Sequence, residues 1–397
     1  MILLPKSFLI LAFLLCAATT ALSEQAFQID ANFPGGNIQV TKIESNTVSL
    51  HQDLRDTAGW WFYWCFRVRG GAGKTISFHF TNGNPIGVCG PAVSLDEGAT
   101  WAWLGHQPKP ASFTYIFPPT ADSVRFCFGM GYTQTNLDSL LDRIGPNPAL
   151  KRETLCQSRQ GRAVERLRVG KLDGEPRFRV MVTCRAHSCE MMTSYLLEGL
   201  METALARGLE GEWFRQNVEM LIIPFVDKDG VEDGDQGKNR RPRDHNRDYD
   251  EHSIYPETKA LREFVPQWSR GKLRLALDLH CPNIRGEFSE VIYLVGSRRP
   301  DSWRAQQRFG GILERAQTGP LVYHAADNLP FGQQWNTLDN FKQGTSAADW
   351  AASLPGVKMA TSLEFPYANA GGREVNQQTA RAFGQDLARA VREYVDR

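Results

Sequence analysis

The sequence has almost no net charge, and it lacks internal repeats, low-complexity tracts and any long hydrophobic run beyond its first 23 residues. Among 397 residues, 45 Lys and Arg stand against 44 Asp and Glu, so no overall field draws the chain to nucleic acid or to an anionic membrane. Hydrophobic residues make up 42% and charged residues 22%, which is ordinary globular composition and excludes disordered, collagen-like and coiled-coil chains. We therefore expect a folded protein with no nucleic-acid partner.

The first 23 residues differ from the rest of the chain. Lys6 is followed by an apolar run over residues 7–22, and the small residues Ala21 and Ser23 precede Glu24. This pattern is typical of a secretory signal peptide. The alternative is an uncleaved membrane anchor, but a span needs about 20 residues, and this run is shorter and mixed with Ala and Thr. We expect cleavage near Ser23, no stable membrane span afterwards, and a secreted or periplasmic protein.

Cysteine is also scarce, with eight residues, of which Cys16 lies in the apolar run. None of the other seven forms a C-x-x-C pair, so a zinc knuckle built from cysteines is not expected. Export favours disulfides, but an odd number of cysteines leaves at least one thiol free. The sequence leaves the disulfide pairing open.

Two patterns divide the remaining chain near the segment Gly-Pro-Asn-Pro at 145–148. Residues 24–147 hold short, alternating, aromatic-rich segments between Gly, Pro and Asn, which predicts an antiparallel β-sandwich domain. In residues 148–397, apolar strands alternate with helical stretches, which predicts an α/β domain with a mostly parallel sheet between helices. The clearest of these are the strands 178–183 and 273–279 and the helices 191–207, 257–268 and 377–395.

Side chains that can bind a metal lie at strand ends of the second domain. His187 and Glu190 stand three apart in a turn between a strand and a helix, and His280 follows the strand 273–279. Two histidines and one carboxylate are a donor set of catalytic zinc sites, which leave the fourth position open for water. Asp278 shares a strand face with His280 and is placed to orient it. The alternative is that the first pair caps a helix and that His280 is a stray strand-end residue.

Two further segments add charged groups. An Arg-rich loop over residues 235–249 contains Asn246 and Arg247, and such groups can hold a carboxylate through charge-assisted hydrogen bonds. The alternative for this loop is an ordinary solvated run of charges. Glu364 closes the apolar strand 359–364, where burying an acid is costly unless the acid is used.

Taken in order, the motifs H-x-x-E, P-x-x-x-x-D-G-V, D-x-N-R, D-L-H and S-L-E resemble those of the M14 zinc carboxypeptidases. They stand at residues 187–190, 224–231, 244–247, 278–280 and 362–364. The first half of the chain adds to this likeness. Residues 61–68, 91–94 and 132–137 are similar to the β-sandwich that precedes the peptidase domain in the cytosolic carboxypeptidase subfamily, and residues 342–345 are similar to a motif of the same subfamily.

This resemblance implies a mixed eight-stranded sheet between helices and one Zn²⁺ per chain, bound by His187, Glu190 and His280. It implies that Glu364 is the general base on the activated water and later the acid to the leaving amine. General chemistry agrees, because zinc lowers the pKa of bound water to about 7 and a nearby carboxylate can take its proton.

The resemblance also assigns the substrate contacts. Asn246 and Arg247 are expected to bind the C-terminal carboxylate of a peptide. An arginine is expected to stabilise the oxyanion of the tetrahedral state. We assign this role to Arg240, because it lies in Lys-Asn-Arg, where the family places such an arginine, although the loop spacing departs from that of the cytosolic members.

Three positions depart from the family pattern or bear on specificity. Cys189 stands between the metal ligands, where digestive members carry an arginine. Phe341 lies near the position of the family's mobile tyrosine and has no hydroxyl. Asp349 lies about where the family places the residue at the bottom of its specificity pocket, and a carboxylate there would attract a terminal Lys, Arg or other amine-bearing residue. The alternative is that Asp349 is an exposed helix residue.

Three functions are therefore open. The first is a secreted zinc exopeptidase that removes a C-terminal residue from peptides. The second is a zinc amidohydrolase of the same fold, acting on N-acyl amino acids or cell-wall amides. The third is a non-catalytic protein that binds peptides or glycans through its aromatic-rich sandwich, and the intact set of metal ligands with Glu364 opposes it.

Overall fold

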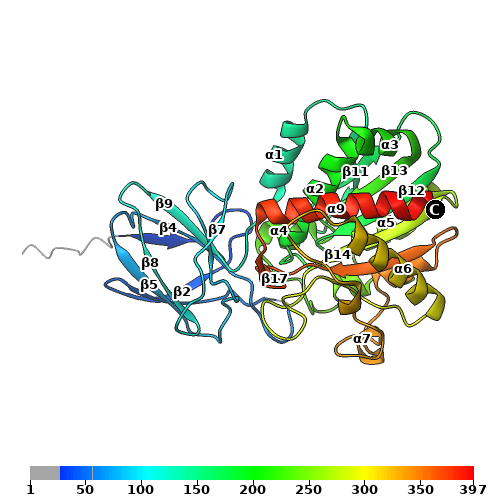
Figure 1. Cartoon of the computed structure of the whole chain (residues 1–397). Coiled ribbons are helices and arrows are strands. Elements are labelled where there is room, and N and C mark those ends of the chain that lie inside the picture. Colours follow the sequence, from blue (N-terminus) through cyan, green and yellow to red (C-terminus); the bar gives the residue numbers. More distant parts are fainter. Residues whose placement is uncertain (1–26, 56) are drawn as a thin grey trace, which may run out of the picture.

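The computed structural model describes residues 27–55 and 57–397, so the predicted signal peptide lies outside the described residues. Figure 1 shows two lobes side by side. The smaller lobe, in blue and cyan, consists of strands, and the larger lobe, from green to red, holds a sheet between helices.

The N-terminal lobe is a sandwich of a five-stranded and a four-stranded sheet. The first sheet has, in spatial order, β1 (Gln28–Asp30), β4 (Cys65–Arg69), β9 (Ser123–Cys127), β6 (Ala92–Ser94) and β7 (Ala102–Trp103). The second has β2 (Gln39–Glu44), β3 (Thr47–His51), β5 (Thr75–Phe80) and β8 (Ser112–Ile116). Neighbouring strands are antiparallel, as predicted, except β3 and β5, which run parallel because the chain passes through β4 of the other sheet between them.

Alternation along the strands builds the core of the sandwich. In β5, Ile76, Phe78 and Phe80 are buried, and Ser77 and His79 between them lie on the outer face. A strand that points every second side chain inward gives one apolar face to the space between the sheets. Further rings packed in this core are those of Trp64, Phe66, Phe113 and Phe126.

The second domain is built around a mixed seven-stranded sheet. Its strands, in spatial order, are β10 (Leu150–Gln157), β11 (Ala163–Gly170), β13 (Val218–Ile223), β12 (Phe178–Cys184), β14 (Leu273–His280), β16 (Met359–Glu364) and β15 (Tyr293–Leu294). The four strands from β13 to β16 are mutually parallel, and β10, β11 and β15 are antiparallel to their neighbours. The expected count of eight strands is therefore too high by one for this sheet. Between β14 and β16 the chain adds only the two-residue β15 and otherwise runs through helices and loops.

Helices cover both faces of this sheet, as the alternating pattern predicted. The helices of the described residues are α1 (Gln134–Ile144), α2 (Met192–Leu205), α3 (Leu209–Asn217), α4 (Lys228–Asp233), α5 (Pro256–Ser269), α6 (Pro300–Ala316), α7 (Leu338–Phe341), α8 (Ala347–Ala352) and α9 (Gln377–Asp396), with short 3-10 turns at His245–Arg247 and Ala325–Asp327. Two short strands, β17 (Asn369–Ala370) and β18 (Arg373–Glu374), form a hairpin before α9. The predicted helices 191–207, 257–268 and 377–395 correspond to α2, α5 and α9.

Alternate residues of the central strands enter two separate cores. Val180 and Leu275 pack in the core that also contains side chains of α2 and α9, whereas Met181 and Ala276 pack with side chains of α5 and α8. Figure 1 shows α9, in red, crossing in front of the sheet. Helices therefore cover both faces of the parallel strands. In sheets of this kind, ligands bind outside the carboxyl ends of the strands.

Helix α1 follows the sandwich along the chain but packs on the second domain. Leu137 and Leu140 line one small cavity together with Leu197 of α2, and Arg143 forms an ion pair with Glu202 at 2.7 Å. This helix precedes the predicted domain boundary at residues 147–148. Within residues 27–55 and 57–397, no helix has both the length and the apolar composition that a bilayer crossing requires.

Candidate active site and metal centre

The turn after β12 is fixed by a buried arginine. Arg185 has a left-handed backbone, with φ of 59°, and is 1% exposed. Its guanidinium donates hydrogen bonds to the carbonyl oxygens of Ser188 and Tyr132, at 2.9 and 3.0 Å. These bonds close the turn that carries His187 and Glu190 before α2 begins.

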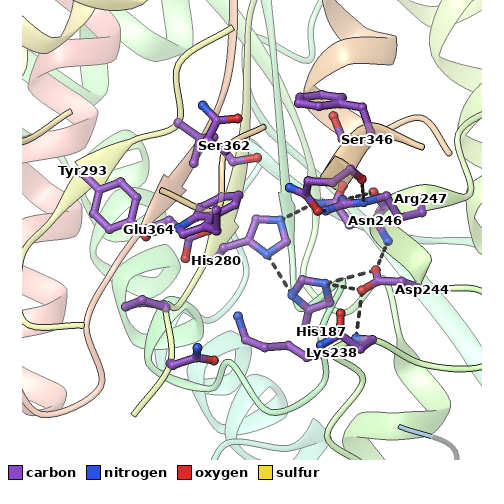
Figure 2. Close-up of a pocket in the computed structure, with 18 of the residues that line it drawn as sticks. His187, Lys238, Asp244, Asn246, Arg247, His280, Tyr293, Ser346, Ser362 and Glu364 are labelled. Atoms are coloured by element: carbon purple, nitrogen blue, oxygen red, sulfur yellow. Dashed lines mark hydrogen bonds and ion pairs between the residues drawn. The ribbon is translucent and has the colours of Figure 1, made fainter. Parts of the chain in front are cut away.

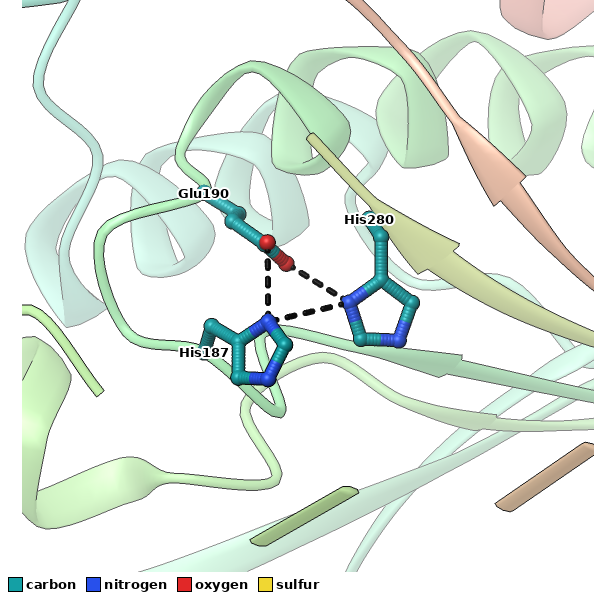
Figure 3. Close-up of side chains that lie close together, drawn as sticks. All are labelled: His187, Glu190 and His280. Atoms are coloured by element: carbon teal, nitrogen blue, oxygen red, sulfur yellow. Dashed lines mark hydrogen bonds and ion pairs between the residues drawn. The ribbon is translucent and has the colours of Figure 1, made fainter. Parts of the chain in front are cut away.

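The side chains of His187, Glu190 and His280 meet at the carboxyl ends of β12 and β14 (Figure 3). The Nδ1 atoms of the two histidines are 3.2 Å apart. His187 Nδ1 lies 2.9 Å from Oε1 of Glu190, and His280 Nδ1 lies 2.9 Å from Oε2. One ligand atom from each residue lies within 4.8 Å of the others, so the structure brings the three predicted ligands within reach of a single metal ion.

The outer nitrogens of both histidines face carboxylates. His187 Nε2 lies 3.0 Å from Asp244 Oδ2, and His280 Nε2 lies 2.6 Å from Asp278 Oδ2. When each Nε2–H donates to its carboxylate, both Nδ1 lone pairs point toward the carboxylate of Glu190. This donor set fits zinc. Asp278 occupies the orienting position predicted for it, whereas sequence reasoning missed Asp244, which its place in the D-x-N-R motif could have suggested.

Glu364 ends β16 directly opposite His280 in the parallel register. It is 6% exposed, and among the described residues its Oε2 has no hydrogen-bond partner. Burial raises the pKa of Glu364, although the positive charge of Lys238 opposes this shift. A buried carboxyl group with an unused oxygen can accept and return a proton near neutral pH.

A cavity of about 280 Å³ opens beside the metal ligands (Figure 2). Its polar wall carries His187, His280, Glu364, Asn246 and Arg247. The remaining lining is mainly uncharged and includes Tyr293, Val295, Trp335, Asn336, Phe341, Ser346 and Ser362. The cavity therefore joins a metal centre to a mostly neutral recess.

The predicted carboxylate-binding pair stands in the wall of this cavity. Asn246 Oδ1 accepts a hydrogen bond from the backbone N–H of Ala347 at 2.9 Å, which fixes the orientation of the amide. The guanidinium of Arg247 donates to the carbonyl oxygen of Asn340 at 3.1 Å and to that of Asn246 at 2.6 Å. The structure thus places both side chains in the same cavity as His280. The amide nitrogen of Asn246 lies 3.0 Å from His280 Nε2.

The two cations of the Lys-Asn-Arg segment occupy different places. Lys238 lines the cavity, and its Nζ lies 2.7 Å from Oε1 of Glu190. Burial alone would lower the pKa of Lys238, but the carboxylates of Glu190 and Glu364 outweigh it and raise the pKa. Arg240 forms ion pairs with Asp227 and Asp235, both at 2.9 Å, and is not among the residues that line this cavity.

Two residues considered for specificity differ in position. Phe341 lines the cavity, and so does Tyr293, which pairs with Glu364 across β15 and β16. Asp349 is half-buried in the first turn of α8 and is not in the cavity lining. Its carboxylate accepts a hydrogen bond from Ser346 Oγ at 3.1 Å, and Ser346 does line the cavity. Asp349 therefore lies behind the wall and not at its surface.

The cysteines of the described residues are all unpaired thiols: Cys65, Cys89, Cys127, Cys156, Cys184, Cys189 and Cys281. Cys189, which stands between the predicted metal ligands, is buried, and its Sγ lies 3.5 Å from the hydroxyl of Tyr367. Burial raises the pKa of this thiol to about 12, which makes it a poor nucleophile and a poor metal ligand at neutral pH.

Comparisons with known proteins agree with this geometry. Residues 139–372 match the sequence model of the zinc carboxypeptidases. The chain is 22% identical over 315 residues to cytosolic carboxypeptidase 3 of Bos taurus, covering 73% of this chain and 30% of that protein. It is 22% identical over 285 residues to cytosolic carboxypeptidase 6 of Caenorhabditis elegans, covering 64% of this chain and 61% of that protein. The chain therefore spans less than two thirds of the length of these relatives.

A solved structure extends the likeness to both domains. The metallo-carboxypeptidase from Burkholderia cenocepacia superposes with a TM-score of 0.76 at 19% sequence identity. The superposition covers 94% of this chain and 99% of that one, so the arrangement of a sandwich before a sheet with helices is shared.

Proposed function

This chain belongs to the zinc carboxypeptidase family, and we propose that it hydrolyses the last peptide bond of peptides that have a free C-terminus. The observation that carries the proposal is the position of Asn246 and Arg247 in the wall of the cavity that holds the metal ligands. An amide and a guanidinium in the same cavity as the metal ligands can select a substrate by its terminal carboxylate.

We infer a division of roles among the residues of the site. Zinc held by His187, Glu190 and His280 would supply a water of lowered pKa and polarise the scissile carbonyl. Glu364 takes a proton from water as the water oxygen bonds to the carbonyl carbon. The same carboxyl group then gives a proton to the amine nitrogen as the C–N bond breaks, so the reaction consumes one water and no other reactant.

Paired substrates test this proposal. The zinc-loaded protein is incubated with peptides that differ only in a free or an amidated C-terminus, and the products are identified by mass. We expect loss of single C-terminal residues from the free peptides. Amidation should reduce kcat/KM severely, by about 2–5 kcal/mol in activation free energy, because the half-buried guanidinium of Arg247 then lacks an anionic partner in the complex. Equal cleavage of both forms would contradict the proposal and favour the amidohydrolase.

The proposal includes export of the protein. Export is supported by three features of the first 23 residues: the basic residue Lys6, the apolar run over residues 7–22, and the small residues Ala21 and Ser23. Export is tested by cell fractionation together with sequencing of the mature N-terminus. A mature chain that begins at Glu24 outside the cytoplasm is expected, and an intact N-terminus inside the cytoplasm would contradict export.

A further inference from the structure

We propose that Lys238, and not Arg240, supplies the positive charge that stabilises the oxyanion of the reaction. The proposal rests on the carboxypeptidase function given above and names a catalytic residue for it. It replaces the assignment that the Lys-Asn-Arg spacing suggested.

The ammonium of Lys238 is held beside the metal ligands by two acceptors. Its Nζ lies 2.7 Å from Oε1 of Glu190 and donates a hydrogen bond to the carbonyl oxygen of Cys281 at 2.6 Å. Cys281 directly follows His280, so both contacts of the ammonium involve the metal-binding segments. An ammonium group has three protons, and these two acceptors leave one for a substrate oxygen. The side chain is 17% exposed and lines the cavity.

Arg240 lies outside the lining of the cavity and is bound to two carboxylates. Its guanidinium forms ion pairs with Asp227, which caps α4, and with Asp235. The side chain of Asp227 is 1% exposed and that of Arg240 is 8% exposed. Rotating Arg240 into the cavity would leave a buried carboxylate without its cation, which is strongly unfavourable.

The sandwich fixes the loop on both sides of Lys238. Gln236 Oε1 accepts a hydrogen bond from the backbone N–H of Phe62 at 2.6 Å, and the backbone N–H of Ala58 donates to the carbonyl oxygen of Asn239 at 3.0 Å. Gln236 is 1% exposed. A charge that is held in place before the reaction stabilises a developing anion without reorganisation, so this domain contact prepares Lys238 for its role.

The chemical step has a defined place for this charge. As the water oxygen bonds to the carbonyl carbon, the carbonyl oxygen becomes negatively charged, and Lys238 donates a hydrogen bond to it. When the C–N bond breaks, the carbonyl re-forms and the charge on oxygen disappears. Lys238 stays protonated throughout, because Glu364 carries the proton from water to the amine.

The test uses the zinc-loaded full-length protein and three variants. Lys238→Met removes the charge at similar length, Lys238→Arg keeps it, and Lys259→Met is the control because Lys259 is exposed on α5. Three quantities are measured: kcat/KM for a peptide with a free C-terminus, bound zinc per chain, and the affinity for a phosphonate analogue of that peptide, whose anionic tetrahedral phosphorus imitates the transition state.

We expect Lys238→Met to keep its zinc while kcat/KM and phosphonate affinity both fall about a hundredfold or more, as for loss of one oxyanion donor. Lys238→Arg should restore a large part of both, and Lys259→Met should change neither. Affinity for a free amino acid, which carries a carboxylate but no anionic tetrahedral phosphorus, should stay constant.

Other results would overturn the role of Lys238. Wild-type kcat/KM in Lys238→Met would return the role to Arg240 or to no cation. Loss of zinc in Lys238→Met would show that Lys238 only holds Glu190 in position. If the wild-type protein cleaves no peptide, the proposed function fails, and the comparison of phosphonate affinities still decides whether Lys238 binds a tetrahedral anion.

Discussion

His280 and Glu364 lie directly opposite each other at the carboxyl ends of the parallel strands β14 and β16. Although 84 positions separate them in sequence, the register places a candidate metal ligand and a buried acid, whose Oε2 has no hydrogen-bond partner among the described residues, on the same edge of the sheet. Under the proposed mechanism, metal binding and proton transfer belong to different residues, so a substitution can remove each on its own.

Removing His280 tests metal binding. His280→Ala should reduce bound zinc well below one per chain, because only His187 and Glu190 would remain as ligands. Metal analysis after dialysis measures this loss, and a chelator should abolish the activity of the wild-type protein. His324→Ala is the matched control, because the side chain of His324 is exposed and does not line the cavity. One tightly held zinc in His280→Ala would contradict the ligand set.

Removing the acid tests proton transfer. Glu364→Gln should retain zinc but lose at least about a hundredfold in kcat, because an amide cannot accept the proton of water. The variant keeps the size of the buried side chain, so its free energy of unfolding should change little. Near-normal kcat in Glu364→Gln would place the general base elsewhere.

The sequence predicted those parts of the site that strand ends determine. His187 follows an apolar strand, His280 and Glu364 end theirs, and parallel strands bring their carboxyl ends to one edge. Asp278 was found in the same way, because residues two apart in a strand share a face. Only a resemblance supported the sheet count, and the sheet has seven strands because the chain adds just the two-residue β15 between β14 and β16.

Loop geometry was not predictable, because it depends on contacts from distant parts of the chain. The contact between His187 and Asp244 joins residues 57 apart, and no periodicity encodes it. The loop that carries Lys238 and Arg240 is hydrogen-bonded through Gln236 to the backbone of Phe62 in the sandwich, a contact across 174 positions. Spacing alone selected Arg240 for the oxyanion, whereas the cavity lining contains Lys238 and not Arg240.

Specificity gives a third prediction, which concerns Asp349. Its carboxylate lies behind Ser346 in the wall of the cavity, whose lining also includes the carboxylate of Glu287. A terminal Lys or Arg that reaches Ser346 would therefore be favoured over Glu or Phe, by about 1 kcal/mol or fivefold in kcat/KM, because the charge acts through a side chain and not by direct contact. Competition between peptides ending in Lys, Glu and Phe measures the preference.

The variant Asp349→Asn tests whether Asp349 causes this preference. It should remove the preference for Lys and leave the cleavage of Phe-terminated peptides unchanged. A preference for Glu, or an unchanged preference for Lys in Asp349→Asn, would exclude Asp349 as the source.

The last prediction concerns the acid stability of the domain and depends on a histidine outside the metal site. His245 is 2% exposed, and its ring stacks on Tyr255 with centroids 3.7 Å apart. Burial lowers the pKa of His245 to about 4. The negative charge of Asp227, whose Oδ1 lies 3.9 Å from His245 Nε2, acts in the opposite direction but does not outweigh burial. The unfolded chain, with a histidine pKa near 6.5, therefore binds more protons than the folded chain between about pH 4 and pH 6.5.

The free energy of unfolding should thus be highest above pH 6.5 and fall by about 3 kcal/mol from this histidine as the pH decreases to 4. His245→Phe keeps a ring against Tyr255 but cannot take up a proton, so its stability should fall less over the same range. Denaturant unfolding at pH 6.5, 5 and 4 measures the difference, with a chelator present so that proton competition with zinc does not contribute. His324→Phe, in which the replaced side chain is 60% exposed, should follow the wild-type curve. If His245→Phe also follows that curve, burial of a neutral His245 does not limit stability in acid.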